Sequence, residues 1–320
     1  MRWNRRRFLS VGALAAGGAT VAGVVWVRTS RTWAARFLRE RLRETRRNIL
    51  PAPLKPMPDG WDPNQITVAW LGQAAVLINF YGLNILTDPA LSPRIGPDLQ
   101  VGVLGPKRFI APPLKIKELP PIDVVVLSHA HWDHMDLPSL NQLARPAFAV
   151  TASATADLLA ETPVRNATEL RWGERATHRG PKGELQVEAF EVKHWGARWR
   201  TDTHRGYNGY LLSRGGKSLI FGGDTAYTPS FARLRSRGPF ELAIMPIAAY
   251  QPWIMNHCTP EEAVRMANEA GARHLVPVHH STFKLSDEPM TEPLERLQAA
   301  LRHEPERIAL RRVGETFVVA

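Results

Sequence analysis

The chain has 320 residues, of which 44% are hydrophobic and 22% are charged, a composition typical of folded globular proteins with one large domain or two small ones. Its formal net charge of +11 is unevenly distributed, because residues 1–50 hold 12 arginines and 2 glutamates and therefore carry +10. The other 270 residues hold 29 basic and 28 acidic side chains, so they lack the basic surface that binding a nucleic acid requires, and we expect no nucleic-acid partner.

Residues 1–30 have the composition of a targeting segment. The run Asn4–Ser10, with the pair Arg5 and Arg6, resembles a twin-arginine export motif. Residues 11–27 carry no charge, and as a helix they would measure about 25 Å, the short limit for a bilayer. We therefore predict a bacterial protein attached to the inner membrane, with its main domain in the periplasm. Attachment at the cytoplasmic face and a plain signal-anchor are the alternatives.

Residues 31–60 are predicted to form a basic amphipathic helix followed by a linker. Between 32 and 50, hydrophobic residues such as Trp33 and Phe37 recur at intervals of three or four, and arginines occupy the other faces. Such a helix suits an anionic membrane surface, although its apolar stripe could equally pack on the domain. Four prolines between 51 and 58 indicate a stiff linker. The remainder, residues 61–320, is predicted to be the main folded domain.

This domain alternates between predicted strands and helices. Strands are expected at 66–71, 75–80, 84–87, 122–127, 147–151, 185–192, 207–212, 217–221, 241–246 and 274–278, and helices at 137–143, 155–161, 229–235 and 260–270. The last helix has the clearest start, since Thr259 is a natural N-cap, Pro260 fits the first position and Glu262 the third. This order predicts an α+β fold of two packed mixed sheets with helices outside.

A dense group of potential metal ligands follows the predicted strand 122–127. His129, His131, Asp133 and His134 fall within six positions. Residues i and i+2 at the end of a strand point the same way, so His129 and His131 can converge on one cation. Asp133 and His134 follow where the chain turns, and can reach a second cation. Imidazole and carboxylate are ligands of Zn²⁺, and this density of ligands disfavours a merely solvated turn.

The spacing H-x-H-x-D-H resembles the signature of the metallo-β-lactamase superfamily. The resemblance assigns three further ligands, His194, a bridging Asp224 and His279, each of which follows a predicted strand. His280 competes with His279, but His279 matches the family position, so His280 is expected to line the cleft or to support a ligand. The resemblance implies an αββα sandwich with two Zn²⁺ ions, although other divalent metals suit the same ligands.

Further motifs resemble the N-acyl-phosphatidylethanolamine-hydrolysing phospholipase D family. They are VAWLG (68–72), LTDP (86–89), GPKRF (105–109), LPPID (119–123), GDTAY (223–227), GPF (238–240), PIAAY (246–250) and HCTPEEAV (257–264). The resemblance runs from about residue 61 to the C-terminus. It implies a phospholipid substrate and cleavage of its phosphodiester, giving an N-acylethanolamine and phosphatidic acid. The oligomeric state stays open, with a homodimer as one option.

The resemblance also assigns roles beyond metal binding. Asp133, Asp224 and His257 are predicted to be catalytic, with a capping or structural histidine as the alternative for His257. The candidate substrate-binding residues are Trp132, Gln73, Tyr250 and His280.

The sequence departs from the family pattern at three places. Gln73 stands where the family has His, Trp132 where it has Tyr, and His279 precedes His-Ser-Thr-Phe instead of Trp-Gly-Thr-Phe. These differences leave all seven ligands in place and bear on the substrate. A lactonase or related ester hydrolase, and a non-catalytic envelope protein with a structural metal, are therefore kept as alternatives.

Overall fold

The computed structural model describes residues 32–98, 102–144 and 147–319. The chain separates into two compact units, Met1–Asn48 and Ile49–Ala320. The predicted export segment, residues 1–30, lies outside the described residues. Among the residues that the structure does describe, none belongs to a helix with the length and hydrophobicity that a membrane crossing needs.

The described part of the first unit is dominated by the helix α2 (Trp33–Thr45). It begins where the Thr32 side chain accepts a hydrogen bond from the Ala35 N–H. The helix is shorter than the predicted range 32–50. Its end is consistent with local competition for its carbonyls, because the Thr45 hydroxyl donates to the Leu42 carbonyl at 2.6 Å.

The second unit is built on two mixed β-sheets. The first has the strand order β13-β1-β2-β3-β4-β5-β6 and the second has the order β12-β11-β10-β9-β8-β7. The strands of the first sheet are β1 (Ile66–Gly72), β2 (Ala75–Phe80), β3 (Leu83–Thr87), β4 (Val124–Val126), β5 (Phe148–Ala152), β6 (Thr168–Leu170) and β13 (Thr316–Val319). Those of the second are β7 (Arg175–Gly180), β8 (Gly183–Phe190), β9 (Gly209–Arg214), β10 (Lys217–Phe221), β11 (Phe240–Pro246) and β12 (Ala272–Val278).

Each sheet contains a parallel and an antiparallel part. Strands β3 to β6 pair in parallel, as do β10 to β12, whereas the neighbouring pairs are antiparallel. The central parallel strands β4 and β11 are buried along their whole length, which explains their largely apolar sequences. The carboxyl ends of the parallel strands β4, β10 and β12, and of the antiparallel strand β8, are followed by the loops that carry the candidate metal ligands.

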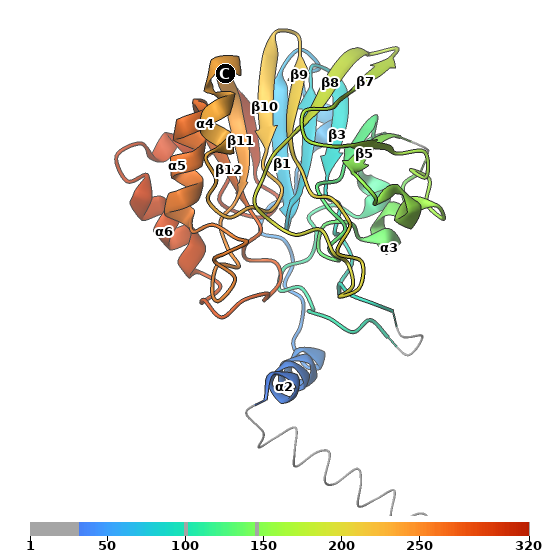
Figure 1. Ribbon diagram of the computed structural model, residues 1–320, viewed down its shortest axis with the longest axis vertical. Coiled ribbons are helices and arrows are strands. Elements are labelled where there is room, and N and C mark those ends of the chain that lie inside the picture. The colour runs from blue at the N-terminus through green and yellow to red at the C-terminus, as the bar shows by residue number, and fades with distance from the viewer. Residues whose placement is uncertain (1–31, 99–101, 145–146, 320) are drawn as a thin grey trace, which may run out of the picture. The chain divides into compact units, whose positions relative to one another are not determined.

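Helices cover the outer face of each sheet, as Figure 1 shows. They are α3 (Leu137–Leu140), α4 (Ser230–Arg233), α5 (Pro260–Ala270) and α6 (Glu292–Ala300). Three hydrophobic clusters correspond to the three interfaces between layers. One fills the space between the sheets, with Trp70 and Ile78 facing Tyr210 and Phe221. The others lie between β8–β12 and the helices α4 to α6, and between β1–β5 and the segments around α3. This arrangement confirms the predicted αββα sandwich.

Helix α5 has the predicted boundaries and caps. The Thr259 hydroxyl accepts from the Glu262 N–H at 3.3 Å, and the Glu262 carboxylate accepts from the Thr259 N–H at 2.9 Å. The helix ends at Gly271, whose φ of +83° is left-handed and suits glycine. Its Ala and Met side chains are buried against the second sheet.

Several other predicted boundaries were wrong. The predicted helix 137–143 ends at Leu140, the range 155–161 contains only a 3₁₀ turn (Ala156–Leu159), and α4 continues as a 3₁₀ turn (Leu234–Arg237). The strands predicted at 122–127 and 185–192 end at Val126 and Phe190, because the backbone there leaves the sheet to enter the ligand loops. Strands β6, β7 and β13 and helix α6 were not predicted. Their sequences are short or partly exposed, so they lack a clear apolar period.

Candidate metal centre

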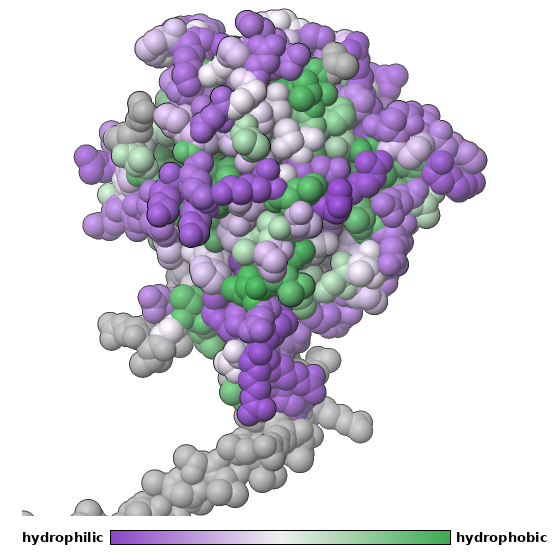
Figure 2. All heavy atoms as spheres, turned by 180° about the vertical axis from the view of Figure 1, so that it is seen from behind, coloured by the Kyte–Doolittle hydropathy of each residue, from purple (hydrophilic) through white to green (hydrophobic). Residues whose placement is uncertain are grey.

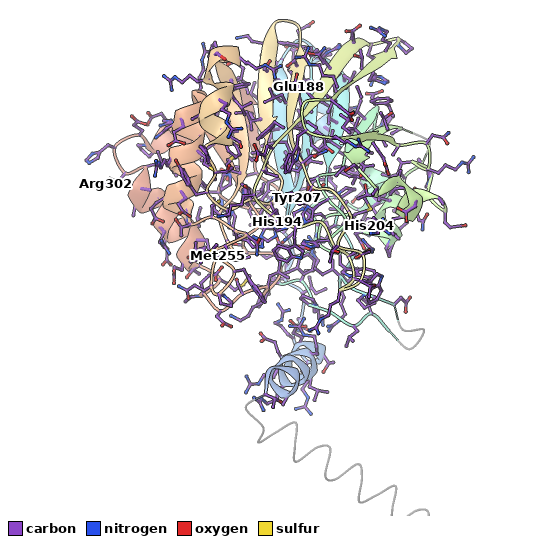
Figure 3. All side chains as sticks on the ribbon, viewed as in Figure 1. Glu188, His194, His204, Tyr207, Met255 and Arg302 are labelled. Carbon is purple, nitrogen blue, oxygen red and sulfur yellow. The ribbon has the colours of Figure 1, made fainter. Side chains whose placement is uncertain are left out.

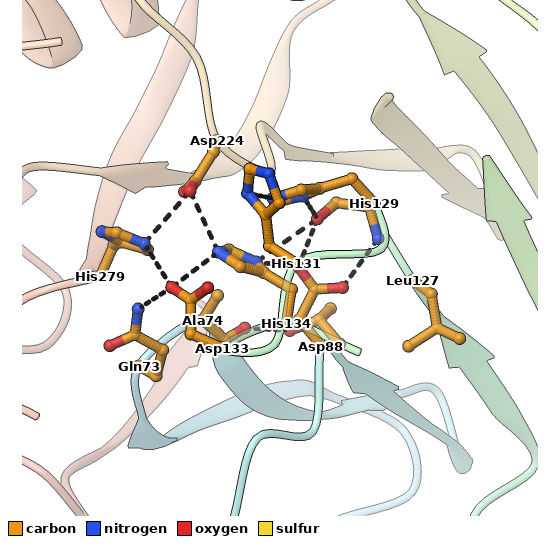
Figure 4. A network of polar contacts seen from close by, with 12 residues as sticks. Gln73, Ala74, Asp88, Leu127, His129, His131, Asp133, His134, Asp224 and His279 are labelled. Carbon is orange, nitrogen blue, oxygen red and sulfur yellow. Dashed lines mark hydrogen bonds and ion pairs between the residues drawn. The ribbon is translucent and has the colours of Figure 1, made fainter. Parts of the chain in front are cut away.

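The seven predicted ligands meet at one end of the sandwich, on loops that follow four strands. The loop after β4 carries His129, His131, Asp133 and His134, and the loops after β8, β10 and β12 carry His194, Asp224 and His279 respectively. Figure 4 shows Asp133, His134, Asp224 and His279 pointing toward one another, with His129 and His131 beside them. In the second sheet, β10 and β12 run in the same direction, and so does β8, which is separated from β10 by the antiparallel β9. Their carboxyl ends therefore lie at one edge of that sheet, and β4 of the first sheet supplies the remaining ligands there.

A tight turn brings Asp224 into this group. Gly223 has a φ of +57°, and a Cβ atom there would lie 2.8 Å from both the Asn208 carbonyl oxygen and the Ser128 Cβ. Only glycine fits this close approach without displacing its neighbours. In the GDTAY motif, Gly223 is therefore required by the fold, and Asp224 supplies the metal ligand.

One group of ligand atoms comes from His129, His131, His194 and Asp224. His129 Nε2 lies 2.7 Å from His131 Nδ1, which lies 3.3 Å from His194 Nε2. The Asp224 Oδ2 atom is 3.7 Å from His194 Nε2. Three nitrogens and one oxygen thus converge on a common centre.

The second group comes from Asp133, His134, His279 and the same Asp224. Asp224 Oδ2 lies 3.1 Å from the Nε2 atoms of both His134 and His279. Asp133 Oδ2 lies 3.0 Å from His279 Nε2 and 3.4 Å from His134 Nε2. Asp224 therefore belongs to both groups, as the bridging role requires.

The geometry of both groups fits divalent cations. Tetrahedral Zn²⁺ with bonds of about 2.05 Å places neighbouring ligand atoms about 3.3 Å apart, and most of the distances above lie near this value. His134 Nε2 and Asp224 Oδ1 are also buried without a hydrogen-bond partner. Buried polar atoms of this kind are costly unless a cation or a substrate pairs with them. We conclude that the residues form a divalent metal site.

Comparison with known proteins identifies the family. A family model described as a beta-lactamase superfamily domain matches residues 83–280. The chain belongs to the metallo-β-lactamase superfamily. Within it, the chain is 29% identical over 283 residues to N-acyl-phosphatidylethanolamine-hydrolyzing phospholipase D 1 of Caenorhabditis elegans, an alignment that covers 80% of this chain and 79% of that protein. It is 32% identical over 241 residues to the mitochondrial enzyme of the same description from Saccharomyces cerevisiae, with 72% and 50% covered.

Other relatives extend this assignment. An uncharacterised protein of Mycobacterium tuberculosis is 35% identical over 258 residues, which cover 78% of this chain and 67% of the relative. Among solved structures, a metallo-hydrolase of Ignicoccus hospitalis has a TM-score of 0.59 at 18% identity, with 80% of this chain and 99% of that chain covered. An isothiocyanate hydrolase from Delia radicum gut bacteria has a TM-score of 0.63 at 17% identity, covering 79% and 99%. These structures share the fold. The family match and the ligand set make the chain a metal-dependent hydrolase of the metallo-β-lactamase superfamily.

In the first ligand group of this hydrolase, burial favours uncharged imidazoles. Burial, together with the neighbouring His134, His131 and His194, holds the pKa of His129 well below its usual value. Burial likewise lowers the pKa of His131 to about 4, although Asp133 opposes the shift, and it lowers the pKa of His194. Their nitrogen lone pairs are therefore available to a cation at neutral pH.

The second group is held by ion pairs. Burial acts to lower the pKa of His279, but Asp224 and Asp133 outweigh it and raise that pKa to about 9. The same carboxylates raise the pKa of His134 well above its usual value. Burial acts to raise the pKa of both aspartates, yet the neighbouring histidines, His134 first, hold them well below the usual range. A cation held by this group would take the place of the protons on His134 and His279.

Hydrogen bonds from outside the ligand set fix the imidazole rings. His129 Nδ1 lies 2.8 Å from Ser128 Oγ, and His194 Nδ1 lies 2.8 Å from the Asn256 carbonyl oxygen. His134 Nδ1 lies 2.6 Å from the buried carboxylate of Asp88, which also accepts the Ser128 N–H at 2.7 Å. Such partners orient the ring and raise the basicity of the ligand.

Sequence reasoning missed Asp88 as a site residue. The signal that could have found it is its place in the LTDP motif directly after β3, because β3 pairs in parallel with β4 and so delivers its end to the same edge. Its φ of +29° is unusual for a residue other than glycine, which is a further sign of a constrained site.

Gln73 contacts the second ligand group through its side chain and its backbone. Its Nε2 atom donates to Asp133 Oδ2 at 2.8 Å, and its backbone carbonyl accepts the His279 N–H at 3.0 Å. The same carbonyl accepts from Trp70 Nε1 at 2.8 Å. Gln73 therefore contacts two ligands of one group, which gives it a role beside the metal site, and its substrate contact stays a prediction.

The other candidate residues lie in different surroundings. His257 joins the site, since its Nδ1 is 3.9 Å from Asp224 Oδ2, and burial lowers its pKa to about 4 although Asp224 opposes the shift. His280 is buried and stacks on Trp70 at 4.4 Å. Trp132 is half-buried beneath the Arg198 guanidinium, 3.6 Å from its ring centroid. Tyr250 points elsewhere, because its hydroxyl donates to Glu292 of α6 at 2.8 Å.

A pocket of about 160 Å³ opens onto the ligands. Its polar walls come from both metal groups and from His257, while its apolar walls come from four further side chains. The lining residues are His131, Asp133, Trp195, Asp224, Ala249, Trp253, His257, His279 and Leu285. Trp132, Gln73, Tyr250 and His280 do not line this pocket, so the structure does not place these four in contact with a substrate there.

Proposed function

We propose that this hydrolase is a zinc-dependent phosphodiesterase of phospholipase D type. Its substrate is an N-acyl-phosphatidylethanolamine, and its products are an N-acylethanolamine and phosphatidic acid. The observation that carries the proposal is the position of Asp224, whose Oδ2 belongs to both ligand groups at the base of an open pocket. The described activity of the nematode and yeast relatives supports the choice of substrate.

When bound, two divalent cations lower the pKa of water and neutralise the charge of a phosphoryl group. The chain's own residues supply the positions. Asp224 and the six other ligands hold one centre beside the other, and Asp133 faces the pocket, where the phosphodiester would lie. Water oxygen forms the new bond to phosphorus as the bond from phosphorus to the ethanolamine oxygen breaks.

His257 is placed to move the proton in this reaction. It lines the pocket, and its Nδ1 has no hydrogen-bond partner. An imidazole there can take a proton from the attacking water and return it to the ethanolamine oxygen as that group leaves, so the proton balance closes without another residue. The apolar walls from Trp195, Trp253 and Leu285 suit the acyl part of the substrate.

The test compares a panel of phospholipids with a panel of lactones, with bound metal measured on the same sample. We expect release of N-acylethanolamine from N-acyl-phosphatidylethanolamine and two zinc ions per chain. Hydrolysis of lactones alone would overturn the substrate in favour of an ester hydrolase. No turnover on either panel, with metal bound, would favour the non-catalytic alternative.

We also propose that residues 1–50 attach the enzyme to the periplasmic face of the inner membrane. Their net charge of +10, against +1 for the remainder, supports this because each Lys or Arg near an anionic surface adds about 1 kcal/mol. We expect the full-length chain in the membrane fraction, and a chain that begins at Pro51 in the soluble fraction. Replacing Arg5 and Arg6 with Lys should block export. Normal export of that variant would exclude the twin-arginine route.

A further inference from the structure

Five large apolar side chains are exposed on two loops beside the metal centre. Trp195 and Trp199 lie between β8 and β9, with 37% and 52% of their surface exposed. Trp253, Ile254 and Met255 lie between β11 and α5, with 45%, 44% and 65% exposed. We call these five residues the apolar rim. Figure 3 labels Met255 on a loop at the same end of the sandwich as His194.

The rim borders the entrance to the metal centre. Trp195 and Trp253 line the pocket, and the Trp195 ring lies 4.7 Å from the ring of His131. Trp199 packs edge-on against Trp132 at 5.2 Å, and Trp132 lies between the ligands His131 and Asp133 in the sequence. A molecule that occupies the pocket therefore lies against Trp195 and Trp253 of the rim.

Local hydrogen bonds hold the second loop in this exposed arrangement. The N–H groups of Asn256 and His257 donate to the Trp253 carbonyl at 2.8 and 3.0 Å, which closes a turn around Ile254 and Met255. The Asn256 carbonyl in turn faces the ligand His194 at 2.8 Å. Moving Ile254 and Met255 inward would disrupt the turn that supports a metal ligand. Their exposure is thus built into the site.

Exposed apolar groups at this density need a partner. The face seen in Figure 2 is mostly hydrophilic, with smaller hydrophobic areas among the charged residues. At about 200 Å² for a large side chain, five side chains at these exposures offer an area on the order of 500 Å². A specific protein interface needs roughly 800 Å² from each partner, so the rim alone is small for a second protein. It is sufficient for insertion into a lipid surface.

We propose that the apolar rim docks the catalytic unit on a phospholipid surface, with the pocket facing the lipid. The inference rests on the proposed function for its substrate, and it adds a membrane contact separate from residues 1–50. Trp and aliphatic side chains favour the boundary between headgroups and acyl chains. Residues 248–257 contain no Asp, Glu, Lys or Arg, while Lys193 and Arg200 are exposed on the first loop and suit anionic headgroups.

A label at Met255 tests this contact in the full-length chain. Cys258 is the chain's sole cysteine and is fully buried, so an environment-sensitive fluorophore can be placed on Met255→Cys. The matched control is Val318→Cys on the edge strand β13, a position that is 45% exposed. On phosphatidylcholine–phosphatidylglycerol vesicles, we expect a blue shift and quenching by lipid-borne nitroxide at position 255 but not at 318. Equal signals at both positions with bound vesicles would overturn the proposal.

A kinetic comparison supplies the second measurement. Ile254→Ser with Met255→Ser should lower kcat/KM on vesicle substrate about tenfold to a hundredfold, because two apolar side chains no longer enter the lipid. Activity on a dispersed short-chain substrate should stay unchanged. The matched control, Met57→Ser with Val318→Ser, removes side chains that are 78% and 45% exposed and should alter neither activity. An equal loss on both substrates in the Ile254 and Met255 variant would overturn the docking role.

The outcomes separate this inference from the proposed function. Lipid contact at position 255 without phosphodiester hydrolysis would keep the docking surface and reject the proposed substrate. Hydrolysis of dispersed substrate without lipid contact at position 255 would keep the proposed substrate and reject the docking surface. A blue-shifted label that depends on protein concentration in the absence of vesicles would show that a second copy covers the rim, which also overturns the proposal.

Discussion

The amide of Gln73 is predicted to control the affinity of the second ligand group for its cation. The informative change is Gln73→Met, because Met has nearly the same length and volume but cannot donate a hydrogen bond. The φ of Gln73 is +51°, and Met has the same backbone preference, so the substitution adds no new backbone strain. The backbone contacts of residue 73 to His279 and Trp70 are retained. The lost interaction is therefore the 2.8 Å bond from Nε2 to Asp133 Oδ2.

The size of the effect follows from this single bond. A hydrogen bond to a charged group contributes about 1.5–3 kcal/mol, which corresponds to roughly 10- to 100-fold in a binding constant. Partners that orient metal ligands show effects of about the same size. We therefore expect the second metal ion to bind roughly 10- to 100-fold more weakly. The first ion should be unaffected, because among the described residues Gln73 makes no hydrogen bond to His129, His131 or His194.

Competition with a chromophoric zinc chelator measures both binding constants without reference to activity. Gln73→His, which restores a donor and the residue usual in the family, should recover part of the affinity. Circular dichroism and the unfolding midpoint in urea serve as controls for the fold. Two ions bound by Gln73→Met as tightly as by the unaltered protein would refute the role of this amide.

Further predictions follow from the same geometry. Asp224→Asn should lower activity by several orders of magnitude while the far-ultraviolet spectrum is unchanged, and a near-normal rate would reject the bridge. His257→Ala should lower kcat about 10²–10⁴-fold with metal content retained, as expected for loss of a proton-transfer group. In a sample whose free metal concentration is 100 times the Kd of the site, removal of the metal with a chelator should lower the free energy of unfolding by about 2.7 kcal/mol, seen as a lower Tm. Arg198→Met should cost about 2–4 kcal/mol in urea unfolding, because Nη1 donates to the Ala130 and Met135 carbonyls at 2.7 and 2.8 Å.

Much of the fold was predictable because local signals agree with the tertiary structure. Helix α5 has a Pro, a capping box and a terminal Gly, each of which acts within one helical turn. Strand β2 is a buried run between turns, apolar except for Asn79. Strand β13 escaped prediction because its identity depends on pairing with β1, from which it is separated by most of the domain. Pairing of that kind leaves no local pattern.

The sequence alone determined which atoms are available to a metal, since His129, His131, Asp133 and His134 follow a buried strand at a spacing that directs them to one edge. The tertiary structure decided which atoms meet. It placed one oxygen of Asp224 between two ligand groups, turned Tyr250 toward Glu292, and set Asp88 against His134. These contacts join residues 30 to 95 positions apart (Asp224 to His194 and to His129 are the extremes), so their geometry depends on strand order and packing. Spacing along the chain carries no information about either.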